Sequence, residues 1–241
     1  MNISTMRQNR RRVAILAGLL AATIAVGTAA QQSTGTPARI RQQQRDAYRS
    51  GGLRAAAAVT GFYVSQMPTG DWGGPTSLEN LAELSSVVAV GTPVSNEAAA
   101  TADGRYIHTF FRVRLTNIMK GDAQPGREVT IIVPGGRVSF EGGSWAQLNS
   151  PGYRKPDPRR PHVWFLKPAP AGLLQGHEPL VGDTRAYVPM FGPLGVYALG
   201  GDKDPVMPNG RFETEFAKSL VREQLPAKAF IARVQAAVAV R

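Results

Sequence analysis

The chain has 241 residues, with 28 Lys or Arg against 17 Asp or Glu, a formal net charge of +11, 43% hydrophobic residues and no cysteine. This length and apolar content suit one domain with a hydrophobic core and argue against intrinsic disorder. The lack of cysteine excludes disulfide scaffolds, thiolate zinc sites and thiol catalysis. Most of the excess charge lies before residue 61, since residues 61–241 hold 19 basic and 16 acidic residues. We therefore expect no nucleic-acid partner.

Residues 1–30 have the pattern of a secretory signal peptide. Three arginines, Arg10 to Arg12, precede an apolar stretch over 13–26, and small residues then lead up to Ala30. We expect an exported protein, periplasmic or secreted, with cleavage near Ala30 and membrane contact only through this segment. The alternative is an uncleaved N-terminal anchor, although the apolar stretch is shorter than the roughly 20 residues that span a bilayer.

The rest of the chain divides by composition into three parts. Residues 31–77 are rich in Gln and Arg and then in Gly and Pro, which predicts a flexible linker and a turn-rich lead-in, with partial helix before residue 61 as the alternative. Residues 78–210 read as the β-barrel domain. Residues 211–241 repeat apolar residues at helical spacing, and Pro226 suits the first turn of a second helix, so we expect a C-terminal helical segment packed on the barrel.

Short strands separated by turn residues fill the central part. We expect strands over 87–94, 106–120, 129–133, 162–167, 187–191 and 195–199, after a short helical or irregular lead-in at 78–84. A bulge is expected at Gly91, inside the first of them. Strands without long intervening helices favour a small antiparallel barrel or sandwich. The predicted fold is thus mainly β with two amphipathic C-terminal helices.

Residues 106–120 alternate along their length, which assigns two rows of side chains to opposite faces of a strand. We expect one row to enter the core: Ile107, Thr109, Phe111, Val113 and Leu115. The other row mixes aromatic and basic residues: Tyr106, His108, Phe110, Arg112 and Arg114.

Seven segments in this order resemble a recurring type of exported bacterial protein, the netrin-like, tissue-inhibitor-of-metalloproteinase-like branch of OB-fold barrels. They are SVVAVGT (86–92), FRV (111–113), MKGD (119–122), PG (125–126), VTIIVPGG (129–136), VWFL (163–166) and GPLGVY (192–197). The resemblance covers about half the chain and implies a small, OB-like, five-stranded barrel with an elaborated connection and a helical flank. Animal inhibitors of this type act through an N-terminal cysteine and disulfides, so their inhibitory chemistry does not transfer to a chain without cysteine.

The connection over 135–161 is expected to be a long loop, and loops of this length are usually functional or mobile. Its last part holds four cations that we take as candidate ligand-binding residues: Arg154, Lys155, Arg159 and Arg160. Such a segment suits an anionic polymer of the cell envelope, phospholipid headgroups or an acidic protein surface. The alternative is a solvated loop without a partner.

The mixed row from Tyr106 to Arg114 is a second candidate ligand-binding surface, because OB barrels bind oligonucleotides and glycans on aromatic and basic faces. The alternative, which we favour from the sequence, is that the C-terminal helices cover this row.

Catalytic patterns are few. The three histidines are far apart in sequence and show no metal-ligand spacing, so no metal or cofactor is expected. We expect His108 and His162 to be half-buried strand residues and His177 to lie in a solvated loop. The predicted function is therefore a non-enzymatic, exported binding or envelope-interaction module. The alternative is an extracytoplasmic hydrolase with His162 as its base.

Overall fold

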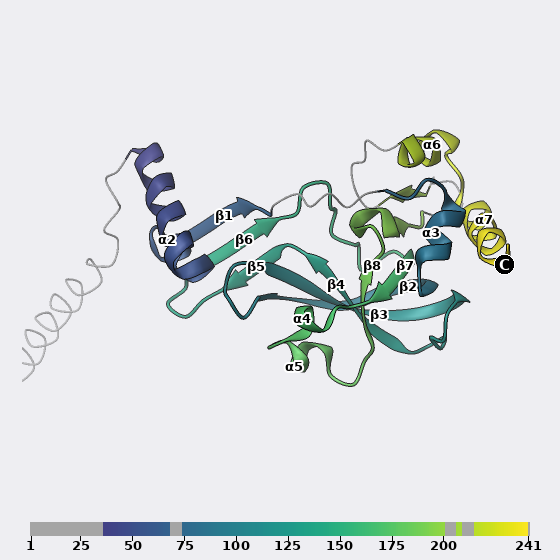
Figure 1. The fold of residues 1–241 in the computed structure, drawn as a ribbon, viewed down its shortest axis with the longest axis horizontal. Helices are drawn as coiled ribbons and strands as arrows, with labels where there is room; N and C mark the ends of the chain where they lie inside the picture. The colour runs from purple at the N-terminus through teal and green to yellow at the C-terminus, as the bar shows by residue number, and fades with distance from the viewer. Residues whose placement is uncertain (1–35, 68–73, 201–205, 209–214, 241) are drawn as a thin grey trace, which may run out of the picture. The chain divides into compact units, whose positions relative to one another are not determined.

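The computed structural model describes residues 36–67, 74–200, 206–208 and 215–240 (Figure 1). Two compact units divide the chain, Met1–Gln42 and Gln43–Arg241. In the described residues, the first unit contains the beginning of helix α2 (Pro37–Ala58). The predicted signal peptide lies outside the described residues. Both sheets and all the cavities discussed below belong to the second unit.

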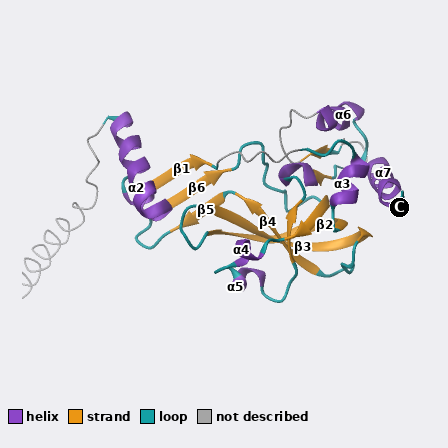
Figure 2. Ribbon diagram, viewed as in Figure 1, coloured by secondary structure: helices purple, strands orange, loops and turns teal. Residues whose placement is uncertain are grey.

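The larger sheet has the strand order β10-β9-β7-β2-β3-β4-β8, and β7 also pairs with β8 (Figure 2). Neighbouring strands are antiparallel except β4 and β8, which run parallel. The strands are β2 (Val87–Ala100), β3 (Ile107–Lys120), β4 (Glu128–Pro134), β7 (His162–Pro168), β8 (Ala186–Pro189), β9 (Val196–Ala198) and β10 (Met207–Pro208). Every strand predicted from the sequence is present, although the last begins as a 3-10 turn, η1 (Gly192–Gly195).

The expected irregularity at Gly91 is confirmed. The pairing of β2 with β3 shifts register between Val90 and Gly91. A Cβ at Gly91 would lie 2.7 Å from Cγ1 of Val113 and 3.0 Å from the carbonyl oxygen of Arg114. Only glycine therefore fits at this crossing without moving its neighbours.

A second sheet corrects the prediction of a long loop over 135–161. Strands β5 (Gly136–Ser139) and β6 (Trp145–Asn149) form a hairpin, and β6 also pairs in parallel with β1 (Phe62–Gln66). The strand order is β1-β6-β5. These strands are short, and the third member of the sheet comes from a distant segment, so local patterning gives a weak signal for them.

The predicted flexible linker over 31–77 is also corrected. Helix α2 and β1 occupy most of the described part of this range. The helix kinks at Gly51 and Gly52, and its last part buries Leu53, Ala56 and Ala57 against the second sheet. The two glycines interrupt the helical period, which is why the sequence reads as a linker. Tertiary packing, rather than helical periodicity, stabilises this helix.

The predicted inward row of β3 is confirmed, since Ile107, Thr109, Phe111, Val113 and Leu115 are all buried. Three of these residues, Phe111, Val113 and Leu115, join one core with side chains from five strands. The other members are Val87, Ala89, Val129, Ile131, Val133, Trp164, Leu166, Tyr187 and Val196.

The expected pair of C-terminal helices is present as α6 (Glu215–Glu223) and α7 (Ala227–Ala239), but it does not cover the predicted row of β3. Together with α3 (Leu78–Leu84), these helices pack over the outer side chains of β2 and β7, including Val88, Val163 and Phe165. Two short helices, α4 (Ala171–Leu174) and α5 (Glu178–Val181), cover Phe110 instead. The outer side chains of β2 and β7 are more apolar than the mixed row of β3. Their burial under the amphipathic helices therefore contributes more to stability.

The fold of the described residues is therefore mixed α/β, with two sheets and six α helices. The prediction of a mainly β protein with C-terminal helices is right in outline. The strands were expected to be antiparallel, whereas the pairings β1–β6 and β4–β8 are parallel.

Candidate functional site

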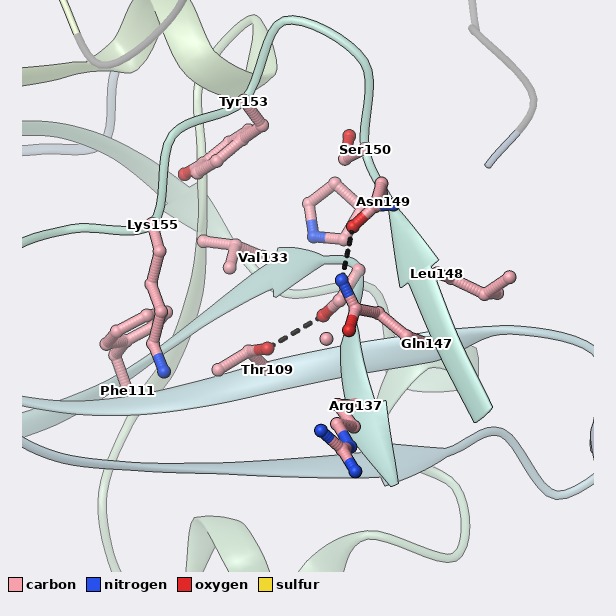
Figure 3. A pocket seen from close by; sticks show the side chains of 13 residues that line it. Thr109, Phe111, Val133, Arg137, Gln147, Leu148, Asn149, Ser150, Tyr153 and Lys155 are labelled. Carbon is pink, nitrogen blue, oxygen red and sulfur yellow. Dashed lines mark hydrogen bonds between the residues drawn. The ribbon is translucent and has the colours of Figure 1, made fainter. Parts of the chain in front are cut away.

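A cavity of about 320 Å³ lies between the end of the larger sheet and the β5–β6 hairpin (Figure 3). Strands β3 and β4 contribute Thr109, Phe111 and Val133, the hairpin contributes Arg137 and Gln147, and the segment after β6 contributes Tyr153 and Lys155. The second sheet thus forms one wall of the cavity and the larger sheet the other. We call this cavity the Arg137–Lys155 pocket.

The charged side chains that line this pocket are all cations. Arg137 and Lys155 are both exposed, and no carboxylate is among the lining residues. Within the described part of the chain, neither side chain forms an ion pair. The ring of Trp145 holds the Arg137 guanidinium, whose central carbon lies 3.9 Å from the ring centre. The pocket therefore presents positive charge to an incoming ligand.

Polar side chains from both walls also line the pocket. Gln147 Nε2 donates to Asn149 Oδ1 over 2.8 Å, and Thr109 Oγ1 donates to the Gly135 carbonyl over 2.7 Å. Figure 3 shows Gln147 and Leu148 on opposite sides of β6, as strand alternation requires. Both residues line the pocket, and Leu148 also joins the core that contains Val138 and Ala146.

Two glycines shape the floor of the pocket. Gly135 and Gly136 have φ values of 90° and 143°, in the region that favours glycine. A Cβ at Gly136 would lie 2.6 Å from Thr109 Oγ1, and one at Gly135 would lie 2.8 Å from the Leu148 carbonyl oxygen. The Gly135–Gly136 pair therefore lets the chain pass closely from the larger sheet to the hairpin.

Tyr153 contributes an aromatic ring to the pocket. Its hydroxyl is buried and finds no hydrogen-bond partner among the described residues. Burial raises the pKa of this hydroxyl well above its ordinary value, so the group stays neutral at physiological pH. Tyr153 therefore adds apolar surface and a polar atom, but no charge.

The four predicted loop cations do not form one site. Lys155 lines the Arg137–Lys155 pocket, whereas Arg154 lines another cavity, of about 260 Å³, beside α6. Arg160 lies 3.8 Å from Asp157, and the backbone N–H of Arg159 donates to the same carboxylate. All four are exposed.

The predicted mixed row of β3 is not a single open surface either. Phe110 is buried, and His108 and Arg112 are half-buried. The Arg112 guanidinium donates to Thr184 Oγ1 over 3.0 Å, and Arg114 pairs with Glu128 at 2.8 Å. Tyr106 and Arg114 are the exposed members, at opposite ends of the row.

The histidines differ in part from their predicted settings. His108 is half-buried, as expected, and burial, with a smaller effect from nearby His177, lowers its pKa to about 4. His177 was predicted in a solvated loop, which is wrong, since it is only 6% exposed and its ring lies 5.1 Å from that of Phe110. The apolar cover of α4 and α5 explains the difference.

The prediction that His162 is half-buried is wrong, because this residue, the base of the alternative hydrolase function, is completely buried. Its ring packs on Trp164 at 5.4 Å, and both ring nitrogens lack a hydrogen-bond partner among the described residues. Burial lowers its pKa to about 4. A general base needs a reachable substrate proton, and this imidazole faces the protein interior.

A larger cavity, of about 770 Å³, lies around the β3–β4 turn and the start of β8. Its three arginines, Arg114, Arg127 and Arg185, are balanced by three acids, Asp122, Glu128 and Asp183. Two ion pairs, Arg185–Asp122 and Arg114–Glu128, neutralise much of this charge. The smaller Arg137–Lys155 pocket is therefore the more selective one for an anion.

Sequence reasoning missed Arg137, Gln147 and Trp145 because it assigned them to a loop. The period-two alternation of 145–149, with Ala146 and Leu148 buried, is the signal that identifies β6. In the described part of the chain, no group of three or more His, Asp or Glu is arranged to hold a metal ion. The described residues also contain no helix with the length and apolar character of a bilayer span.

Comparison of the chain with protein-family models and with curated proteins found no match.

Proposed function

We propose that the protein is a non-enzymatic binding module that acts outside the cytoplasm and holds an anionic polymer of the cell envelope in the Arg137–Lys155 pocket. The single observation that carries this proposal is the charge of the lining, in which both ionised side chains are cations. Charge-assisted hydrogen bonds to Arg and Lys are the strong contacts that proteins use for carboxylates and phosphates. Gln147 and Ser150 add neutral hydrogen-bonding groups for the rest of the ligand.

We propose further that five strands of the larger sheet close into an OB-like barrel of the netrin-like type. The pairings β2–β3, β3–β4, β4–β8, β8–β7 and β7–β2 form a cycle that returns to its first strand. A single core drawn from these strands supports the same arrangement. The β5–β6 hairpin then stands in the elaborated connection that the resemblance implies. OB barrels bind oligosaccharides and oligonucleotides, which fits a polymeric ligand.

Export remains part of the proposal because of the basic and apolar pattern of residues 1–30. An exported protein with a cationic pocket meets the anionic polymers of an envelope directly.

The proposal is tested by titrating the purified protein with polygalacturonate, a linear polymer with one carboxylate per sugar. The fully methyl-esterified polymer serves as the matched neutral ligand. We expect binding of the acid form only, and binding that weakens as ionic strength rises. Lys155→Ser should weaken binding about 10-fold, since a charged hydrogen bond is worth roughly 1.5 kcal/mol.

Arg159→Ser is the matched control, because it removes an exposed cation from the same loop but not from the pocket. Equal losses with Lys155→Ser and Arg159→Ser would assign binding to the whole loop. Equal binding of the neutral and acidic polymers would overturn the electrostatic proposal.

A further inference from the structure

One face of the second sheet is covered and the other is open. Strands β1, β6 and β5 lie side by side (Figure 1), and alternate residues of each strand point to opposite faces. Tyr63, Val138 and Ala146 point to one face, where they pack with the last part of α2. The residues between them are exposed or half-buried. Six of these form what we call the outer face: Phe62, Val64, Arg137, Trp145, Gln147 and Asn149.

An aromatic and cationic row crosses the outer face. The central carbon of the Arg137 guanidinium lies 3.9 Å from the Trp145 ring centre, and the Phe62 ring centre lies 5.5 Å from it. Arg137 and Phe62 come from the strands on opposite sides of β6, so they enclose the Trp145 ring between them. Phe62 stands at the rim of the sheet and is 47% exposed. The outer face therefore offers a ligand the ring of Phe62 rather than that of Trp145.

The outer face begins inside the Arg137–Lys155 pocket. Arg137, Gln147 and Asn149, which line that pocket (Figure 3), all belong to this face as well. Phe62 is the register partner of Trp145. Trp145 lies two residues before Gln147, which is about 7 Å along a strand. A chain-like ligand that fills the pocket and continues along β6 therefore reaches Phe62.

The side chains of the outer face select among anionic polymers. The sequences of β1, β5 and β6 contain one cation, Arg137, and no acid, so their charge favours an acidic ligand. The amides of Gln147 and Asn149 both donate and accept hydrogen bonds, which suits hydroxyl groups. The exposed ring of Phe62 suits a ligand surface made of C–H groups. A sugar ring presents such a surface with hydroxyls around its rim, whereas inorganic polyphosphate has neither.

We propose that the outer face extends the pocket into a longer binding site for an acidic polysaccharide. One sugar carboxylate lies at Arg137 and Lys155, and a following sugar ring stacks on Phe62. This site rests on the proposed function of the pocket, which anchors the chain that Phe62 receives.

Calorimetric titration with a galacturonate octamer and a galacturonate dimer tests the second contact. Phe62→Ala should weaken binding of the octamer about 5-fold, in line with the strength of an aromatic stacking contact. It should not change binding of the dimer, which we expect to occupy the pocket alone. Phe62→Tyr keeps the ring and should bind the octamer within about 2-fold of the unmodified protein.

Leu84→Ala is the matched control, because it removes an equally exposed apolar side chain from α3, and it should change neither affinity. A thermal melt of each variant checks that it folds. Full octamer binding by a folded Phe62→Ala protein, or equal losses of dimer and octamer binding, would overturn the contact at Phe62.

Two other acidic polymers test the class of ligand. Inorganic polyphosphate and polyglutamate carry a charge on every unit but have no sugar rings. Phe62→Ala should therefore leave their affinities unchanged. A loss with either polymer equal to the loss with the octamer would overturn the polysaccharide class, and with polyglutamate it would identify an acidic polypeptide as the occupant.

An NMR measurement on the unmodified protein does not depend on any variant. We expect nuclear Overhauser effects between the ring protons of Phe62 and the C–H protons of the bound octamer. Effects to the ring of Tyr153, which lines the pocket, with none to Phe62 would overturn the contact. Sedimentation of the protein alone should show a monomer. A dimer that Phe62→Ala dissociates would show that a second copy covers the outer face and would overturn the proposal.

Two variants keep this proposal distinguishable from the function proposed for the pocket. Lys155→Ser should weaken binding of both the dimer and the octamer, whereas Phe62→Ala should weaken the octamer alone. Octamer binding that responds to Lys155→Ser but not to Phe62→Ala would overturn the outer-face site and leave the pocket in place. No binding of either galacturonate ligand would overturn both.

Discussion

The guanidinium of Arg137 lies over the ring of Trp145, with its central carbon 3.9 Å from the ring centre. The same ring also stacks on Phe62, whose ring centre lies 5.5 Å away at an interplanar angle of 21°. An exposed arginine on a strand would ordinarily sample several rotamers. The stack restricts it, so the positive charge is already placed at the pocket before a ligand arrives.

This relationship predicts that Trp145 acts on the ligand through Arg137. Arg137→Gln should weaken polygalacturonate binding about 10-fold, because it removes a charge-assisted contact. Trp145→Leu should weaken it about 3-fold, because a cation–π contact at an exposed site is worth roughly 0.5–1 kcal/mol. The double variant should bind like Arg137→Gln alone.

Titrations of all four proteins under one buffer condition measure these ratios. Arg127→Gln, which removes an exposed cation from the larger cavity, is the control and should bind normally. If the losses from the two single variants multiply in the double variant, Trp145 contacts the ligand itself and does not act through Arg137.

Half-buried His108 and buried His162 predict a loss of stability in acid. Burial lowers the pKa of both His108 and His162 to about 4, against an ordinary value of 6.5. Between these values the unfolded chain binds protons that the folded protein does not, so the stabilisation is full above about pH 6.5 and falls as the pH drops toward 4. As the pH falls from about 7 to about 5, each histidine should lower the free energy of unfolding by on the order of 2 kcal/mol.

Urea denaturation at these two pH values measures the effect. His162→Phe should flatten the dependence, because it removes one of the two titrating groups from an apolar site. A free energy of unfolding that is equal at both pH values would contradict the burial of these histidines.

The buried indole of Trp164 ties β7 to the irregular part of β2. Its Nε1–H donates to the Gly91 carbonyl over 3.0 Å, and the side chain is completely buried. Trp164→Phe leaves that carbonyl without its donor and should lower the free energy of unfolding by about 1–3 kcal/mol. Tyr106→Phe, at an exposed residue, should change it by less than about 0.5 kcal/mol. Equal effects from the two substitutions in urea denaturation would contradict the role given to this hydrogen bond.

Phe110 is buried under α4 and α5, so we expect this member of the β3 row to contribute to stability and not to ligand binding. Phe110→Ala should destabilise the protein by about 3 kcal/mol, since it leaves a cavity in an apolar cluster. Its affinity for polygalacturonate should not change under conditions where the variant is folded. Loss of affinity at unchanged stability would restore the row as a binding surface.

The fold was predictable where its signal is local. The β-branched runs of β2, β4 and β7, the alternation of β3 and the helical period of the C-terminus all identify their elements correctly. Helix α2 was expected only as partial helix within a linker, and strands β1, β5 and β6 were missed, because each element is stabilised by partners far away in the sequence. Gly51 and Gly52 also interrupt the helical pattern of α2, so the segment resembles a linker in sequence.

The candidate site was predictable only in part, for the same reason. Lys155 stands out as a cation in a proline-containing segment, and it does line the pocket. Arg137 and Trp145 become part of the site through the β5–β6 hairpin, which places them side by side. The charge of the loop could be read from the sequence, but the grouping of its cations could not, since Arg154 and Lys155 line different cavities.

The most direct test of the polymer-binding proposal locates the ligand by NMR. Side-chain amide signals of Gln147, which lines the Arg137–Lys155 pocket, and of Gln124, which lines the larger cavity, are followed during titration with polygalacturonate. We predict that the Gln147 signals, with those of the hydrogen-bonded Asn149, shift in a saturable way while the Gln124 signals stay unchanged. Shifts confined to Gln124, or the same shifts with the methyl-esterified polymer, would contradict an anion site at this pocket.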